Sequence, residues 1–182
     1  FPPVIGKLTK LTHLGLGENQ FTKLPPEIGH LTNLIWLYLE GNQLSTLPPE
    51  IGQLTNLTGL SLRGIHFTAL PSEIGNLTKL VFLKLGENQF TMLPPEIGKL
   101  TNLTWLYLEG NQLTTLPPEI KKLTKLTELQ IERNPLTDEG LEHLKSLKSL
   151  KRLNLCETKI TKTGVGSFKK ALPNCEIEVL RK

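Results

Sequence analysis

Apolar residues recur along this chain in a fixed order, and that order repeats every 23 residues. The string LPPEIG, or a close variant of it, occurs once per period, starting at Leu24, Leu47, Leu70, Leu93 and Leu116. Each period reads LxxLxLxxNxLxxLPPEIGxLTx, and counted from its first leucine the periods open at Leu11, Leu34, Leu57, Leu80, Leu103 and Leu126. A seventh period opens at Leu150 after a 24-residue unit. Self-similarity at such a period is the signature of a solenoid.

The segment LxxLxL within each period predicts a β-strand. Its fourth and sixth positions are apolar and alternate with polar residues, as in a strand with one buried face. A strand this short cannot bury its face alone, whereas stacked repeats form one continuous core and pair every strand edge except the two terminal ones. We therefore expect eight parallel strands, centred near residues 14, 37, 60, 83, 106, 129, 153 and 177.

The remainder of each period predicts a turn and one turn of helix. In five of the seven repeats an asparagine at the ninth position follows the strand (Asn19, Asn42, Asn88, Asn111 and Asn134), and its amide can hydrogen-bond to backbone groups where regular pairing stops. The Leu-Pro-Pro that follows fixes φ and removes backbone donors, so the chain turns outward. A glutamate comes next, in the first turn of the short helix, where the helix dipole favours a carboxylate; these residues are Glu27, Glu50, Glu73, Glu96 and Glu119.

These repeats resemble those of bacterial-type leucine-rich-repeat proteins, of the 23-residue kind with LPxxI on the outer side. The resemblance covers residues 1–182 and implies an α/β repeat solenoid, a right-handed horseshoe with a parallel sheet on its concave side. The family's usual role is to bind another protein through that sheet. The last units differ, because they contain LTDEGLEHL and end in LPNC, as in the helix-bearing repeats of many such proteins.

The repeats divide the chain into units of a single domain. We expect five 23-residue repeats at 11–125, helix-bearing repeats at 126–149 and 150–171, and a capping strand at 172–182. A helix capped by Thr137 or Asp138 should run to about Leu147, and another should begin at Thr161 or Thr163 and end near Ala171. Helices are thus expected on the convex side only after Pro135.

Residues 1–10 read as the outer half of a further repeat, because FPPVIG at Phe1 fits the same period. Terminal caps normally break a repeat pattern, and this segment keeps it. We therefore expect a truncated repeat, with a first core layer that is partly exposed and an edge strand available for weak self-association of an otherwise monomeric chain. The alternative is that residues 1–10 fold over the first strand as a cap.

All four Trp and Tyr residues fall at positions that should face the concave side. The third, fifth and seventh positions of repeats two to five give the candidate partner-binding residues Trp36, Tyr38, Glu40, Gly59, Ser61, Arg63, Phe82, Lys84, Trp105, Tyr107 and Glu109. Gly59 and Ser61 are small, so a notch with a low floor is expected between Trp36 and Phe82, with Arg63 at one end. The repeat at Leu80 copies the one at Leu11, and the repeat at Leu103 copies the one at Leu34, which indicates duplication of a 69-residue block.

Two interpretations of the aromatic residues are open. They could stiffen the sheet by packing against cross-strand neighbours. Alternatively they form a binding site, because Trp, Tyr and Arg dominate binding hot spots and exposed apolar patches mark contacts. The second interpretation predicts a protein or peptide ligand, identity unspecified; carbohydrate stacked on the rings is a less favoured possibility.

The remaining chemistry of the sequence indicates neither an enzyme nor a cofactor. The histidines share no metal-ligand spacing with Cys, Asp or Glu, and we find no catalytic acid–base pair, nucleophile or phosphate loop. Any catalytic role would belong to a larger multidomain enzyme of GTPase, kinase or ubiquitin-ligase type in which this segment recognises a substrate or ligand. The net charge of +4 resides in residues 121–182, which carry +6, whereas residues 1–120 carry −2. Lysines and aromatic strands are thus separate, which argues against nucleic-acid binding, and no apolar run is long enough to insert into a membrane.

Overall fold

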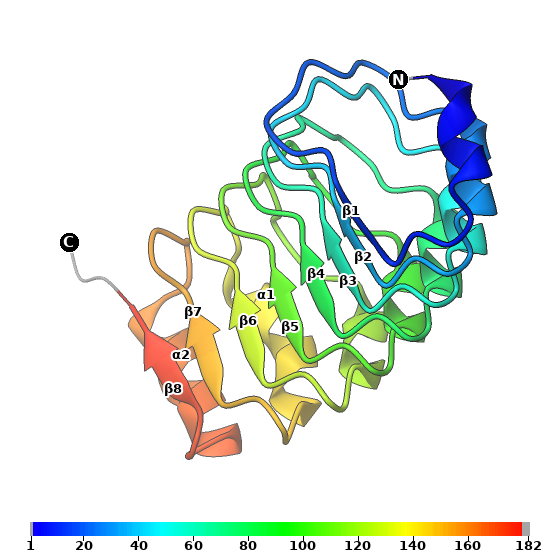
Figure 1. Ribbon diagram of the computed structural model, residues 1–182. Coiled ribbons are helices and arrows are strands. Elements are labelled where there is room, and N and C mark those ends of the chain that lie inside the picture. Colours follow the sequence, from blue (N-terminus) through cyan, green and yellow to red (C-terminus); the bar gives the residue numbers. More distant parts are fainter. Residues whose placement is uncertain (1, 180–182) are drawn as a thin grey trace.

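The computed structural model describes residues 2–179, and these form one curved row of stacked repeats (Figure 1). Eight parallel strands lie in chain order, β1-β2-β3-β4-β5-β6-β7-β8. Their bounds are His13–Gly15 (β1), Trp36–Tyr38 (β2), Gly59–Ser61 (β3), Phe82–Lys84 (β4), Trp105–Tyr107 (β5), Glu128–Gln130 (β6), Arg152–Asn154 (β7) and Glu176–Glu178 (β8). Each strand is centred where the repeat pattern predicted it, and the eight strands are parallel as expected.

The sheet is in the register that the repeat dictates, with each residue opposite the one a repeat later. Trp36 lies opposite Gly59, Gly59 opposite Phe82, and Phe82 opposite Trp105. The strands run side by side, and the short helices lie on the other side of each coil (Figure 1). Side chains at any one position of the repeat therefore form a row across the sheet, so surface chemistry can be read directly from the repeat.

The outer side of each coil is a single 3-10 turn until the last repeats. These turns are Pro3–Lys7 (η1), Pro26–His30 (η2), Pro49–Gln53 (η3), Ser72–Asn76 (η4), Pro95–Lys99 (η5), Pro118–Lys122 (η6) and His143–Ser146 (η7). From η2 to η6 each has its glutamate in the first turn, as predicted. The isoleucine of each motif is buried, and this fixes the turn against the core.

Within residues 2–179 the α-helices occur only after Pro135, at Asp138–Glu142 (α1) and Lys162–Ala171 (α2). The expectation that the first would run to about Leu147 was wrong, because the chain tightens into η7 after Glu142. The second expectation was right: Thr161 caps α2, and its hydroxyl accepts a hydrogen bond from the Gly164 amide. Asp138 ties the two helices together by accepting hydrogen bonds from the Thr161 amide and hydroxyl, at 2.7 and 2.6 Å. These bonds lower the pKa of the Asp138 carboxyl.

A ladder of asparagines holds successive coils together. In the fourth repeat, Asn88 Nδ2 donates to the carbonyls of Leu62, Leu85 and Gly86, and its Oδ1 accepts from the amides of Ile65 and Phe67. Asn42, Asn111 and Asn134 make similar contacts with their own strand and with the preceding repeat. The predicted role of the asparagine in the turn is confirmed, and it also extends across the repeat boundary.

The core is continuous through the stack and becomes more accessible at its first layer. Leucines of the central repeats are fully buried, whereas Leu11, Leu14 and Leu16 are only partly buried, and Val4 and Leu8 are more than half exposed. β1 is the first strand of the sheet order. The expected partial exposure of the first core layer is thus confirmed, while the part of that expectation concerning Phe1 lies outside the described residues.

Candidate functional site

The concave face carries a cluster of aromatic rings from the second, fourth and fifth repeats. The ring of Trp36 stacks on Tyr38, with centroids 5.6 Å apart and planes 14° apart. Trp36 also meets Phe82 at 5.7 Å, and Phe82 meets Tyr107 edge-on at 5.4 Å. These four residues, called here the aromatic cluster, are joined by ring contacts on the face where their repeat positions place them.

The predicted notch between Trp36 and Phe82 is absent, because the indole of Trp36 fills it. A Cβ atom added to Gly59 would lie 2.1 Å from Trp36 Cε3, so the ring rests directly on the glycine backbone. Gly59 and Ser61 are consequently buried and form no open floor. Strand alternation gives the face on which a side chain lies but not its rotamer. The large Trp36 ring therefore packs into the space left by the missing side chain of Gly59.

Trp105 differs from the four rings of the aromatic cluster. It is 37% exposed, and it makes no ring contact with another aromatic residue among residues 2–179. Its backbone is opposite Phe82 in register, so it lies at the border of the aromatic cluster. Trp36, which occupies the equivalent position one block earlier, is half-buried.

A polar network lies beside the aromatic cluster on the C-terminal side. The buried Glu128 carboxylate accepts hydrogen bonds from the Tyr107 hydroxyl and Gln130 Nε2, each at 3.1 Å, and pairs with Arg152 at 2.7 Å. Burial, and then the bond to Glu128, raise the pKa of the Tyr107 hydroxyl. Tyr107 is therefore held in one orientation as a hydrogen-bond donor. Glu128 and Arg152 were not among the predicted site residues, although both occupy the third position of their repeats and so face the concave side.

Carboxylates line the edge of the sheet at which the strands end, and we call this row the acidic rim. It comprises Glu18, Glu40, Glu87, Glu109 and Glu132. One oxygen of Glu40, of Glu109 and of Glu132 is buried without a hydrogen-bond partner. Burial is the main cause that raises the pKa of Glu109 and of Glu132. Buried, incompletely paired carboxylates favour a cation nearby.

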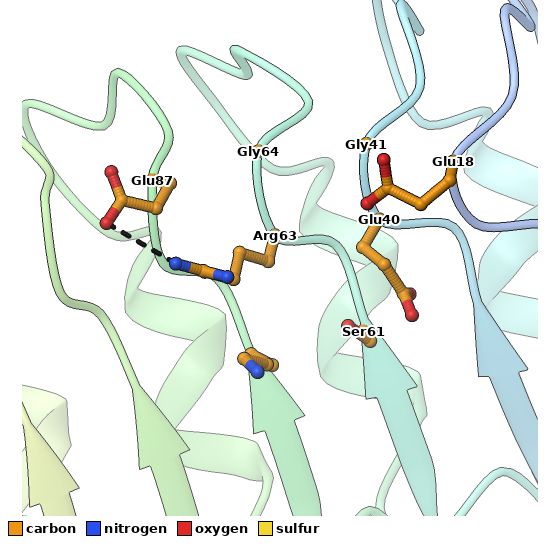
Figure 2. Close-up of a pocket in the computed structure, with 8 residues that line it drawn as sticks. Glu18, Glu40, Gly41, Ser61, Arg63, Gly64 and Glu87 are labelled. Atoms are coloured by element: carbon orange, nitrogen blue, oxygen red, sulfur yellow. Dashed lines mark ion pairs between the residues drawn. The ribbon is translucent and has the colours of Figure 1, made fainter.

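Two arginines of the protein already contact this rim. Arg63 lies 3.5 Å from Glu109 through Nε and 3.7 Å from Glu87 through Nη2, and Figure 2 shows it pointing toward Glu87. Arg133 Nη2 also pairs with Glu87. Arg63, Glu40 and Glu109 were among the predicted site residues, whereas Glu18, Glu87, Glu132 and Arg133 were not in that set.

Three of these omissions, Glu18, Glu87 and Arg133, concern the eighth position of the repeat. This position has positive φ in all seven repeats, at Glu18, Gly41, Gly64, Glu87, Gly110, Arg133 and Glu157. A residue with positive φ is outside the strand conformation, so the direction of its side chain does not follow the in–out alternation of the strand before it. Glycine at three of the seven positions was the available signal in the sequence.

The hollow between Glu18 and Glu87 has a volume of about 420 Å³ and is also lined by Glu40, Gly41, Ser61, Arg63, Gly64 and Lys84 (Figure 2). It lies beside the aromatic cluster, because Ser61 and Lys84 end the strands that carry Gly59 and Phe82. Among residues 2–179 no group of three or more His, Cys, Asp or Glu is placed to hold a metal ion. In the same range no helix is long and apolar enough to cross a membrane.

Comparison with known proteins identifies the family. A sequence model described as leucine-rich repeat region matches residues 3–84 and 72–170. The chain therefore belongs to the leucine-rich-repeat family, of the bacterial type. No curated protein matches the chain.

Several solved structures share the fold over nearly the whole chain. A leucine-rich-repeat protein of Leptospira interrogans is 42% identical with a TM-score of 0.91, and the match covers 97% of this chain and 45% of that one. An internalin of Listeria monocytogenes is 26% identical with a TM-score of 0.85, over 99% of this chain and 50% of that one. The plant peptide hormone receptor RGFR1, solved in complex with RGF2, is 31% identical with a TM-score of 0.73, over 99% of this chain and 29% of that one. This chain thus spans half or less of each of these proteins.

Proposed function

We propose that the chain is a non-catalytic recognition module that binds a protein or peptide on its concave face. The observation that carries the proposal is Trp105, a large ring left 37% exposed beside the aromatic cluster. A tryptophan in this setting provides a large apolar area that a partner can cover, and such residues dominate interface energetics. Trp36, Tyr38, Phe82 and Tyr107 extend the apolar surface on one side of Trp105, and the acidic rim borders the same surface.

A structural relative of this chain that was solved with a bound partner supports this proposal. The plant receptor is described in complex with RGF2, so a structure with this fold does hold a partner. Parallel strands with one exposed face provide a broad, rigid surface on which side chains vary without altering the core. Because this chain spans 45% of the Leptospira protein, a role as the recognition segment of a larger multidomain enzyme is the alternative; the surrounding reading frame tests it.

The two tryptophans should respond differently to truncation. Trp105→Ala should weaken binding by about 2–4 kcal/mol if the ring is a hot spot, while the free energy of unfolding changes by less than about 1 kcal/mol. Trp36→Ala should reduce both binding and stability, because its ring packs on Tyr38, Phe82 and Gly59.

The measurement is a two-step binding assay. Wild-type protein captures partners from extract, mass spectrometry identifies them, and calorimetry with a purified partner then gives Kd for each variant. Lys99→Ala, on the opposite side in η5, is the matched control and should bind normally. Undiminished affinity in a folded Trp105→Ala variant would show that the concave face is not the site.

A further inference from the structure

The duplicated block places the same interlocked pair of residues at two points along the acidic rim. In the first copy the carboxylate of Glu18 lies over Gly41, and a Cβ on that glycine would be 2.5 Å from Glu18 Oε1. In the second copy Glu87 lies over Gly110, and a Cβ there would be 2.8 Å from Glu87 Oε2. The glycines have nearly equal φ, +64° and +63°. Both copies therefore send a glutamate across the next repeat toward the repeat beyond it.

The second copy shows what such a glutamate binds. Glu87 reaches past Gly110 to Arg133, and the two side chains form an ion pair. The residue equivalent to Arg133 in the first copy, 69 positions earlier, is Gly64. A Cβ built on Gly64 has no atom within 4 Å, so the space beside it is open. The first copy thus has the acidic partner and lacks the guanidinium.

This open space belongs to the hollow of about 420 Å³ shown in Figure 2, which Glu18, Glu40 and Gly64 all line. Neither Glu18 nor Glu40 has an ion-pair partner within the described part of the chain. The Glu40 carboxylate leans back over Gly17, where a Cβ would lie 3.0 Å from Glu40 Cδ, just as Glu109 leans over Gly86, so Glu18 is the carboxylate that extends toward Gly64. Arg63 and Glu87 line the opposite wall, where the Arg63 guanidinium is already paired with Glu87 and Glu109 (Figure 2 shows the pair with Glu87).

We propose that this hollow binds an arginine side chain of a protein partner, held by Glu18 as Glu87 holds Arg133. The proposal rests on the proposed function, since the partner is the one that covers the concave face. A guanidinium suits the site because it is planar, always charged, and able to donate two parallel hydrogen bonds to one carboxylate. Lys84 also lines the hollow, so an acidic group bound to Lys84 is the competing outcome.

The test uses N-acetyl-arginine amide as the probe and the neutral isostere N-acetyl-citrulline amide as its control. Chemical shifts of the backbone amides are followed by NMR as each compound is added to the whole protein. The arginine compound should shift the amides of Gly41 and Gly64, and the citrulline compound should leave them unchanged. Glu18→Gln should weaken arginine binding by about tenfold, which corresponds to the loss of one charge-assisted hydrogen bond, whereas Glu27→Gln in η2 should have no effect.

Two exchanges between the copies give the sharper test. Gly64→Arg should supply the missing guanidinium and abolish the response, and it is structurally reasonable because Arg133 itself adopts φ +54° at that position of the repeat. Arg133→Gly should open a second site, visible as new shifts at Gly110. Each variant is first checked for a wild-type spectrum elsewhere.

Equal shifts with arginine and citrulline, a response to N-acetyl-aspartate amide instead, or an unchanged response in Gly64→Arg would overturn the proposal. These outcomes need no natural partner, so they are independent of the Trp105→Ala binding assay. If the arginine compound does not bind but Trp105→Ala weakens partner binding as predicted, this inference alone is refuted. If the arginine compound binds but Trp105→Ala leaves the affinity for the partner unchanged, the proposed function alone is refuted.

Discussion

Gly59 shows how one missing side chain shapes the concave surface. Because the Trp36 indole rests on its backbone, Gly59→Ala should push the ring away, and overpacking of this kind costs about 1–3 kcal/mol. Urea unfolding measures the loss, and near-UV circular dichroism should report a displaced indole.

Gly15→Ala is the matched control, since Gly15 also lies in a strand and a Cβ there meets nothing within 4 Å. It should be neutral or slightly stabilising, because alanine loses less backbone entropy on folding. Equal effects of the two substitutions would contradict the packing assigned to Trp36.

Glu132 gives a pH dependence whose sign follows from its surroundings. Burial and the neighbouring Glu109 raise its pKa above the ordinary value of 4.5. The folded state therefore holds the proton more tightly than the unfolded state, and the resulting stability is present below about pH 4 and lost as pH rises through the raised pKa. Arg133 and Glu178 also face this carboxyl, with opposite effects on its pKa.

Glu132→Gln should consequently be more stable than wild type at pH 7, by less than about 1 kcal/mol because the group is partly solvated. The difference should vanish below pH 4, where wild-type Glu132 is protonated in both states. Thermal unfolding of both proteins between pH 3.5 and 7 measures this. A variant that is less stable at pH 7 would mean that the Glu132 carboxylate is stabilised rather than penalised by its site.

At the scale of elements, the asparagine ladder connects one coil to the next. Asn88→Ala should cost about 3 kcal/mol or more, because it leaves buried amides of Ile65 and Phe67 and buried carbonyls unpaired. Asn19→Ala is the comparison: its side chain is exposed and donates only to Leu16 and Gly17 in its own repeat. That change should cost less than about 1 kcal/mol, as measured by chemical denaturation. Similar losses for both would show that the ladder does not couple repeats.

Strands and turns were predictable from the sequence because the apolar positions that recur every repeat are the positions that are buried in each coil. The positions of β1 to β8 and the start of α2 at its Thr161 cap follow from local pattern alone. The end of α1 was not predictable to the residue, because α-helical and 3-10 hydrogen bonds differ little in energy over one turn.

The site was predictable only as far as side-chain direction follows from strand alternation. Trp36, Phe82 and Tyr107 share a face because they share strand positions, as expected. Whether the Gly59 gap stays open depends on the rotamer of Trp36, which the repeat does not determine. Strand alternation could not predict Glu18, Glu87 and Arg133 as site residues, because the positive φ at the eighth position ends the alternation there.

At the scale of the molecule, the duplicated block creates a surface of two related halves. One half has its carboxylates paired with arginines of the chain, and the other leaves Glu18 and Glu40 without ion-pair partners among the described residues. The aromatic cluster spans both halves, with Trp36 and Tyr38 in the first and Phe82 and Tyr107 in the second. We infer that a partner which covers the aromatic cluster also reaches the unpaired half of the acidic rim.

Site-specific photo-crosslinking tests most directly whether the concave face is the binding surface. A photoreactive phenylalanine analogue replaces Lys84 in β4 on the concave side in one variant and Lys99 in η5 on the opposite side in another. With the purified partner, the account predicts an adduct from position 84 that Trp105→Ala removes, and none from position 99. An adduct from position 99 together with none from position 84 would contradict it.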